Sequence, residues 1–251
     1  MSHSHNLLAR KRQGILSCLL LLSTALLGPT ARADQPSLPA LTLSAEPAPQ
    51  TLIDDGDTAP SKKPLYLQAQ FAAASESDFG PAILFYYEQP DQKTNLSSLS
   101  VGRFLRDDLF GWPAEVVSYA SIQYFGERGF QPDAIGTAFY IKAYKHFKLG
   151  KSQFPLRIGL GEGLSYVSRI PIVEVEDFAP DTSAKLTNYL EWTMQTSLNH
   201  LLGHGGQRFS PGIKDVYLGY SVFHRSTVFG LFASKGGGVN FMGLSVELVL
   251  D

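Results

Sequence analysis

Two polar side chains, His224 and Ser226, stand two residues apart near the C-terminal end of the chain. In an extended strand, residues two apart project from the same face, with their Cα atoms roughly 6.5 to 7 Å apart. An imidazole nitrogen can reach a serine oxygen across that gap, which places a general base beside a nucleophile. The spacing therefore indicates acyl transfer or ester hydrolysis, and such hydrolysis requires no cofactor.

A third polar residue, Asn240, follows where the chain resumes its alternation after residues 227–239. Even positions are apolar on both sides of this connection, so Asn240 is expected on the same face as His224. If the two segments form a symmetric hairpin, Asn240 lies opposite His224 or close to it. Its side-chain oxygen could then hold the imidazole in the tautomer whose other nitrogen accepts the serine proton.

The elements that must position these residues are predicted to be β-strands, because apolar and polar residues alternate with period two. The alternation is clearest over 154–166, 185–198, 216–222 and 242–248, and weaker over 65–73, 82–88, 95–105, 114–125 and 134–148. Runs of about 10 to 14 residues are long for a soluble sandwich but suit tilted strands that cross a membrane.

The polar face of these strands carries glycines and the ionisable residues Lys142, Arg157, Glu191 and Glu247, which we expect to form ion pairs inside a barrel. We therefore predict an all-β, closed antiparallel transmembrane β-barrel of eight strands, with ten as the alternative count. Side chains fill the interior of an eight-stranded barrel, so no pore is expected. The competing folds are a soluble β-sandwich and a lipocalin-like binder with an apolar interior.

One residue departs from this pattern. Glu162 falls on the otherwise apolar face of its strand, where a charge facing lipid is unfavourable. We expect it to lie near a membrane interface or to be turned inward by a bulge.

The N-terminus has the order of a secretory signal peptide, with basic residues 10–12, an apolar run over 15–27 and a small-residue site ending at Ala33. The alternative is a retained membrane anchor. We predict a signal peptide over residues 1–33, a flexible arm over 34–63 that is rich in Pro, Ala, Ser and Asp, and an outer membrane β-barrel over 64–251. Cys18 lies within the leader, ahead of most of the apolar run, and is not expected to be lipidated.

Charge and cysteine content exclude several functions. The formal net charge is −2, and without residues 1–33 the chain has 17 basic and 23 acidic residues, a balance of −6. This balance argues against nucleic-acid binding, which requires a basic surplus. Cys18 is the only cysteine. The predicted mature chain therefore has no disulfide, thiolate nucleophile or cysteine metal site.

Other chemistry-bearing residues are expected to be structural. His200 and His204 are four apart, but their segment is predicted to be a strand end entering a turn, without the helical geometry of a zinc site. The acidic segment 174–181 could bind calcium weakly, and a solvated loop is the preferred interpretation. The serine in 161–165 is not in a Gly-x-Ser-x-Gly elbow, because no helix is expected to follow it. We predict no metal site.

The residues around His224 resemble a known family. The segments 219–226 (GYSVFHRS) and 236–241 (GGGVNF), with the glycine-rich strand 159–166 (GLGEGLSY), resemble the C-terminal part of the PagL-type lipid A 3-O-deacylases. The resemblance implies an eight-stranded outer membrane barrel that hydrolyses a 3-O-linked acyl ester of lipid A, the lipid anchor of lipopolysaccharide in the outer leaflet. It assigns His224 as base and Ser226 as nucleophile. Asn240 stands where the family has a glutamate, and Thr227 stands where it has an asparagine that is a possible oxyanion donor.

A non-catalytic outer membrane barrel with an envelope structural or adhesion role is the alternative function. Asn240 cannot offer a charge to the imidazolium, and Thr227 has one hydroxyl donor where an amide has two. Both differences favour a scaffold that has lost its activity.

Overall fold

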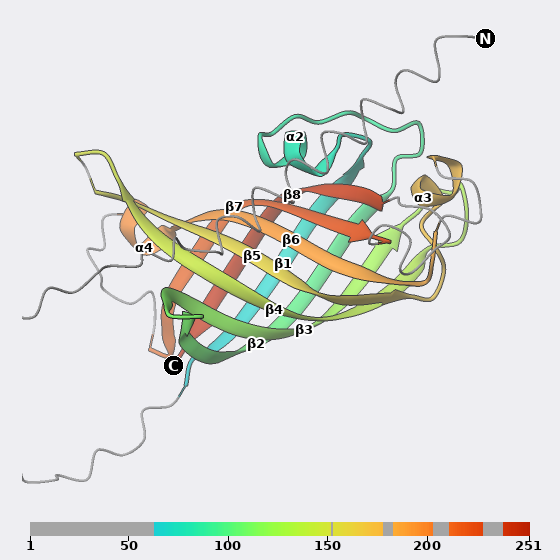
Figure 1. Ribbon diagram of the computed structural model, residues 1–251. Coiled ribbons are helices and arrows are strands. Elements are labelled where there is room, and N and C mark those ends of the chain that lie inside the picture. The colour runs from blue at the N-terminus through green and yellow to red at the C-terminus, as the bar shows by residue number, and fades with distance from the viewer. Residues whose placement is uncertain (1–62, 152, 178–182, 203–210, 228–237) are drawn as a thin grey trace, which may run out of the picture. The chain divides into compact units, whose positions relative to one another are not determined.

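The computed structural model describes residues 63–151, 153–177, 183–202, 211–227 and 238–251, which form a closed barrel (Figure 1). Each strand pairs antiparallel with the next, and β8 closes on β1. The strands are β1 (Leu65–Ser75), β2 (Asn95–Leu109), β3 (Trp112–Gly126), β4 (Ala134–Leu149), β5 (Phe154–Val167), β6 (Leu186–Ser197), β7 (Ile213–Ser226) and β8 (Gly238–Leu250). The predicted closed eight-stranded barrel is confirmed. The predicted leader, and the predicted arm apart from Lys63, lie outside the described residues.

The register of the strands gives the tilt of the barrel. One row of Cα partners starts at Leu65 and passes through Arg103, Ser118, Ile141, Glu162, Leu190, His224 and Asn240. The row returns to β1 at Ser75, ten residues beyond Leu65. This offset of ten residues is the shear of the barrel. For eight strands it corresponds to a strand tilt of roughly 40°, and the row rises by about 25 Å along the barrel axis. We call the end at Ser75 the upper end.

Apolar side chains cover much of the outer face of the barrel. Examples from four different strands are Phe71, Leu99, Ile122 and Phe139, each more than 60% exposed. Since no second sheet or layer covers these strands in the described ranges, the apolar stripe of each strand points outward. An apolar outer band about 25 Å tall is typical of barrels that cross a membrane.

Aromatic rings fill the middle of the barrel. Tyr119 stacks on Tyr140 with ring centroids 5.0 Å apart, and Tyr140 stacks on Tyr189 at 4.1 Å. Phe223 continues the column, 4.7 Å from Tyr189 and 5.9 Å from Phe241. These five residues are almost fully buried. The column therefore occupies the space that a pore would need.

Charged side chains share this interior as the alternation predicted. Lys142 Nζ lies 3.0 Å from Glu191, and Arg157 lies 2.7 Å from Glu247, with all four side chains at 1% exposure or less. The second Glu247 oxygen accepts a 2.6 Å hydrogen bond from the Tyr144 hydroxyl. Pairing offsets the cost of removing these charges from water. The predicted interior ion pairs are confirmed.

The upper end of the barrel is closed by the connection after β5. Its helix α3 (Ile172–Asp177) places Glu174 2.5 Å from Arg225, and both side chains are buried. Burial raises the pKa of the Glu174 carboxyl, and the Arg225 guanidinium acts in the opposite direction. The prediction that Glu174 belongs to a solvated loop is wrong, because its carboxylate is needed inside the barrel as the partner of Arg225. Asp181, from the same predicted loop, lies outside the described residues.

Two local predictions are also wrong. Residues 82–88 do not form a strand: helix α2 (Phe79–Ile83) occupies the start of this run, and its cap at Leu84 donates to the Ala82 and Pro81 carbonyls. The run is apolar without true alternation, and Pro81 suits a helix start better than a sheet interior.

His200 lies in the one-turn helix α4 (Leu198–Leu201), which begins because the Ser197 side chain accepts from the His200 amide. His204 lies outside the described residues.

Glu162 faces outward and is exposed, and the register of its strand pairs is uninterrupted. The expected bulge is therefore absent from this part of β5. Glu162 lies four strand steps from Leu65 in the row, about 12 Å above it. Its place relative to a membrane interface stays a prediction. The sheet register decides its position, and no neighbouring side chain turns it inward.

Candidate functional site

The hairpin of β7 and β8 brings together two of the predicted site residues. His224 and Asn240 are directly paired across the strands, and both project from the outer face of the barrel. The Nδ1 atom of His224 lies 2.9 Å from the Oδ1 atom of Asn240. The register assumed for a symmetric hairpin is thus the observed one, and Asn240 supports the imidazole from the side.

A backbone carbonyl fixes the orientation of the Asn240 amide. Its Nδ2 atom donates a 2.5 Å hydrogen bond to the carbonyl oxygen of Ser77, which can only accept. The amide oxygen must then face His224, so the imidazole donates from Nδ1. In the neutral ring with its proton on Nδ1, the lone pair is on Nε2, which is the tautomer that a general base needs.

The Nε2 edge of the imidazole lies over Gly238 of β8. A Cβ atom on Gly238 would lie 2.9 Å from His224 Nε2 and 2.7 Å from Cε1, so the ring lies over this glycine. Gly238 is the direct strand partner of Ser226. Ser226 and His224 project from the same face of β7, with Cα atoms roughly 6.5 to 7 Å apart. The hairpin therefore places Asn240 beside the Nδ1 edge of His224, and places His224 and Ser226 on one face of β7.

The connection between β1 and β2 covers one side of this site. Phe79 of α2 packs against the His224 ring with centroids 5.4 Å apart. Below it, Ala82 forms an apolar cluster with Val222 and Met242 on the outer face of β7 and β8. The site is therefore partly desolvated: His224 is half-buried, and Asn240 is only 3% exposed. Shielding from water strengthens the hydrogen bonds that hold the imidazole.

Thr227, the predicted oxyanion residue, directly follows Ser226 at the end of β7 and is buried. Its position beside the nucleophile is compatible with a backbone or hydroxyl donor. Its role remains a prediction.

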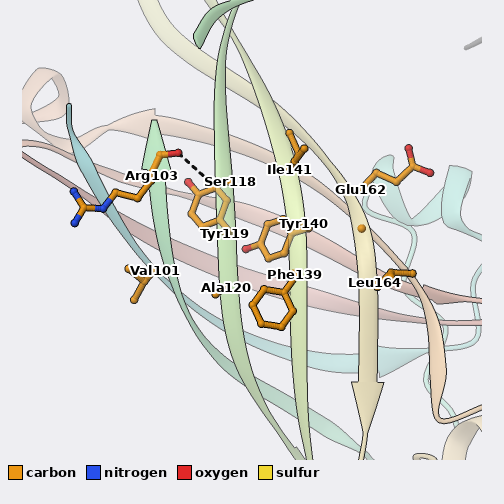
Figure 2. A pocket seen from close by; sticks show the side chains of 11 residues that line it. Val101, Arg103, Ser118, Tyr119, Ala120, Phe139, Tyr140, Ile141, Glu162 and Leu164 are labelled. Carbon is orange, nitrogen blue, oxygen red and sulfur yellow. Dashed lines mark hydrogen bonds between the residues drawn. The ribbon is translucent and has the colours of Figure 1, made fainter. Parts of the chain in front are cut away.

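The hollow in Figure 2 lies elsewhere on the outer face, across β2 to β5, and has a volume of about 520 Å³. Arg103 and Glu162 stand at opposite sides of it, with Ser118 and Ile141 between them, and both charged ends point away from its centre. No histidine lines it, so it offers no base for a serine nucleophile. The candidate catalytic group therefore remains on β7 and β8.

In the described ranges, no three His, Cys, Asp or Glu side chains lie close enough together to hold a metal ion. Within the same ranges, no helix has the length and apolar character to cross a bilayer.

Sequence reasoning missed two contributors to the site. Ser77 acts through its backbone carbonyl, which carries no residue-type signal. Phe79 lies in a segment with no motif. Arg225, between His224 and Ser226, is buried inside the barrel. Its odd position could have placed it there, since neighbours in a strand face opposite sides.

Comparisons with protein-family models, with curated proteins and with solved structures found no match for this chain.

Proposed function

We propose that this protein is a bacterial outer membrane β-barrel that hydrolyses a 3-O-linked acyl ester of lipid A. The observation that carries the proposal is the hydrogen-bonded chain from the Ser77 carbonyl through Asn240 to His224, on the outer wall beside Ser226. A serine esterase needs such a held imidazole. Because the group faces outward, its substrate must approach from the surrounding lipid.

The shape of the barrel supports a membrane location. Two upper connections are long, residues 76–94 and 168–185, whereas two lower hairpins close within 110–111 and 150–153. The third lower connection, 198–212, is longer than these two hairpins. Long loops at one end and short turns at the other are typical of outer membrane barrels, whose long loops face outside the cell. The upper end, with Ser226, would then lie at the outer leaflet, where lipid A resides.

The mechanism follows from the protonation state of His224. Ser226 Oγ attacks the acyl carbonyl while His224 Nε2 takes the hydroxyl proton. The tetrahedral intermediate collapses, the ester bond breaks, and the imidazolium returns the proton to the departing sugar oxygen. Water, deprotonated by the same nitrogen, then hydrolyses the acyl-serine and releases a fatty acid.

Asn240 keeps the ring aligned in both steps, and the backbone amides after Ser226, with Thr227, would receive the oxyanion. An amide orients the ring without adding charge, so the imidazolium gains less stabilisation than from a carboxylate.

A non-catalytic envelope barrel is the second candidate. It is favoured by the asparagine at the position of the family's acid and by an interior that side chains fill. In that case Asn240 and His224 would serve only to attach the β1–β2 connection to the barrel wall.

Mass spectrometry of lipid A from cells that express the protein distinguishes the two. We expect wild type to remove one 3-O-linked acyl chain, and Ser226→Ala and His224→Ala to leave lipid A intact. Ser97→Ala, also on the outer face in β2, is the matched control and should behave as wild type. Identical lipid A with wild type and Ser226→Ala, both shown to be folded, would reject the esterase.

A further inference from the structure

The connection between β1 and β2 folds back along the outside of the barrel. Figure 1 shows α2 outside the ring of strands, beside β8. Ala82 packs on Val222 and Met242, and its carbonyl accepts a 2.8 Å hydrogen bond from the Tyr220 hydroxyl. Phe85 then packs on the Tyr220 ring, with centroids 4.6 Å apart. The segment therefore follows β7 downward from the upper end.

The depth of this segment can be worked out from the register. His224 lies two strand steps before Ser75 in the row, and Tyr220 lies four residues further down β7. With a tilt of roughly 40°, Tyr220 is about 16 Å below the level of Ser75. The contact between Phe85 and Tyr220 therefore lies past the middle of the 25 Å apolar band.

The segment exposes an unusual run of apolar side chains. Four consecutive residues are exposed: Leu84 at 78%, Phe85 at 56%, Tyr86 at 58% and Tyr87 at 44%. Phe85 contacts the barrel at Tyr220, and the exposed surface of the four residues adds to the apolar outer band. Exposed apolar surface of this size normally marks contact with a partner or a membrane.

Four backbone amides of the segment are hydrogen-bonded to nearby carbonyls, as a lipid environment favours. The amide of Ala82 donates to Asp78, that of Leu84 to Pro81, and that of Phe85 to Ala82. The Tyr86 amide also donates to the Pro81 carbonyl, and Pro81 itself has no amide hydrogen.

We propose that residues 79–87 form a membrane-inserted flap, whose side chains at 84–87 contact the acyl chains of the outer leaflet beside the His224 and Ser226 site. Acyl chains are the occupant because the flap is continuous with the apolar band and lies within its height. The proposal rests on the membrane location in the proposed function, and is independent of whether the site hydrolyses an ester. In an active enzyme, the flap would form one wall along which a substrate acyl chain reaches Ser226.

Spin labels on single cysteines test the flap. The only native cysteine, Cys18, lies in the predicted leader, so Leu84→Cys and Tyr86→Cys can be labelled without a second site in the mature chain. The purified barrel in phospholipid vesicles is probed with oxygen, which concentrates in hydrocarbon, and with a polar nickel chelate, which stays in water. Leu244→Cys on the outer face of β8 is the lipid reference, and Phe130→Cys in the β3–β4 connection is the water reference.

We expect labels at 84 and 86 to match the label at 244, with a several-fold higher ratio of oxygen to nickel accessibility than at 130. Labels at 84 and 86 that match the label at 130 would overturn the flap while leaving the barrel in the membrane. Low accessibility to both probes would mean that protein, such as a second copy, covers the segment, and would overturn contact with lipid. A nickel-accessible label at 244 would refute the membrane location, and the flap with it.

Discussion

Replacing Asn240 by aspartate should lower activity, although it supplies an acid at the position where the PagL-type pattern has one. In the structure, the amide makes two hydrogen bonds: Oδ1 accepts from His224 Nδ1 at 2.9 Å, and Nδ2 donates to the Ser77 carbonyl oxygen at 2.5 Å. An aspartate keeps the first contact. It turns the second into a carboxylate oxygen facing a carbonyl oxygen.

The expected loss of activity can be worked out from the loss of the Nδ2 donor to the Ser77 carbonyl. Asn240 is 3% exposed and Ser77 is 4% exposed, so water does not readily replace the amide. Leaving a buried acceptor unsatisfied costs about 1–3 kcal/mol. If the catalytically aligned position of the imidazole is destabilised by this free energy, the rate of acyl release decreases by roughly 5- to 150-fold. Because the carboxylate also stabilises the imidazolium, we expect the observed loss to lie in the lower part of that range.

The assay is the initial rate of acyl release from lipid A in detergent micelles, for wild type, Asn240→Asp and Asn240→Ala. ¹⁵N NMR of the imidazole supplies a reading independent of turnover. It should show a proton on Nδ1 and a free Nε2 in wild type, and a mixture of tautomers in Asn240→Ala. An Asn240→Asp variant as active as wild type or more so would refute the role given to the Ser77 carbonyl.

Three further predictions concern the barrel and the hairpin. Glu247→Gln should destabilise the fold by about 1–3 kcal/mol, because it removes the nearest carboxylate from the buried Arg157 and leaves it Glu115 at 3.6 Å and the Gln195 side-chain oxygen. Arg157→Met/Glu247→Gln should recover part of that loss in urea unfolding from vesicles. Glu162→Leu should stabilise the barrel by about 1–2 kcal/mol in a bilayer, and an unchanged unfolding midpoint would argue against a lipid-facing position. Gly238→Ala places a Cβ atom 2.7 Å from the His224 ring and 2.2 Å from the Arg225 carbonyl oxygen. It should reduce acyl release about 100-fold while circular dichroism remains that of a barrel.

Period-two alternation predicted the barrel and its ion-paired interior. It gave nine candidate runs, of which 82–88 is not a strand, and the even strand number of such barrels led to the count of eight. The reason is physical: each strand has one face toward packed side chains and one toward the surroundings, so its pattern reports both. The same parity placed His224 and Asn240 on one face, and the symmetric hairpin supplied their pairing. These features depend only on local sequence and on neighbouring strands.

The features that could not be predicted depend on contacts between distant segments. The run at 82–88 is apolar enough for a strand, yet α2 forms because Ala82 can pack on Val222 and Met242 and bond to Tyr220. The Ser77 carbonyl orients Asn240 from 163 positions away. Neither contact leaves a trace in residue spacing, so the sequence identified the site without the segment that covers it.

The most direct test of the proposed chemistry uses purified protein and lipid A that carries a 3-O-linked acyl chain, in detergent micelles, with free fatty acid measured over time. The account predicts steady release by wild type and by Ser97→Ala, and none by folded Ser226→Ala or His224→Ala. Release by folded Ser226→Ala at the rate of wild type, or no release by folded wild type, would contradict it.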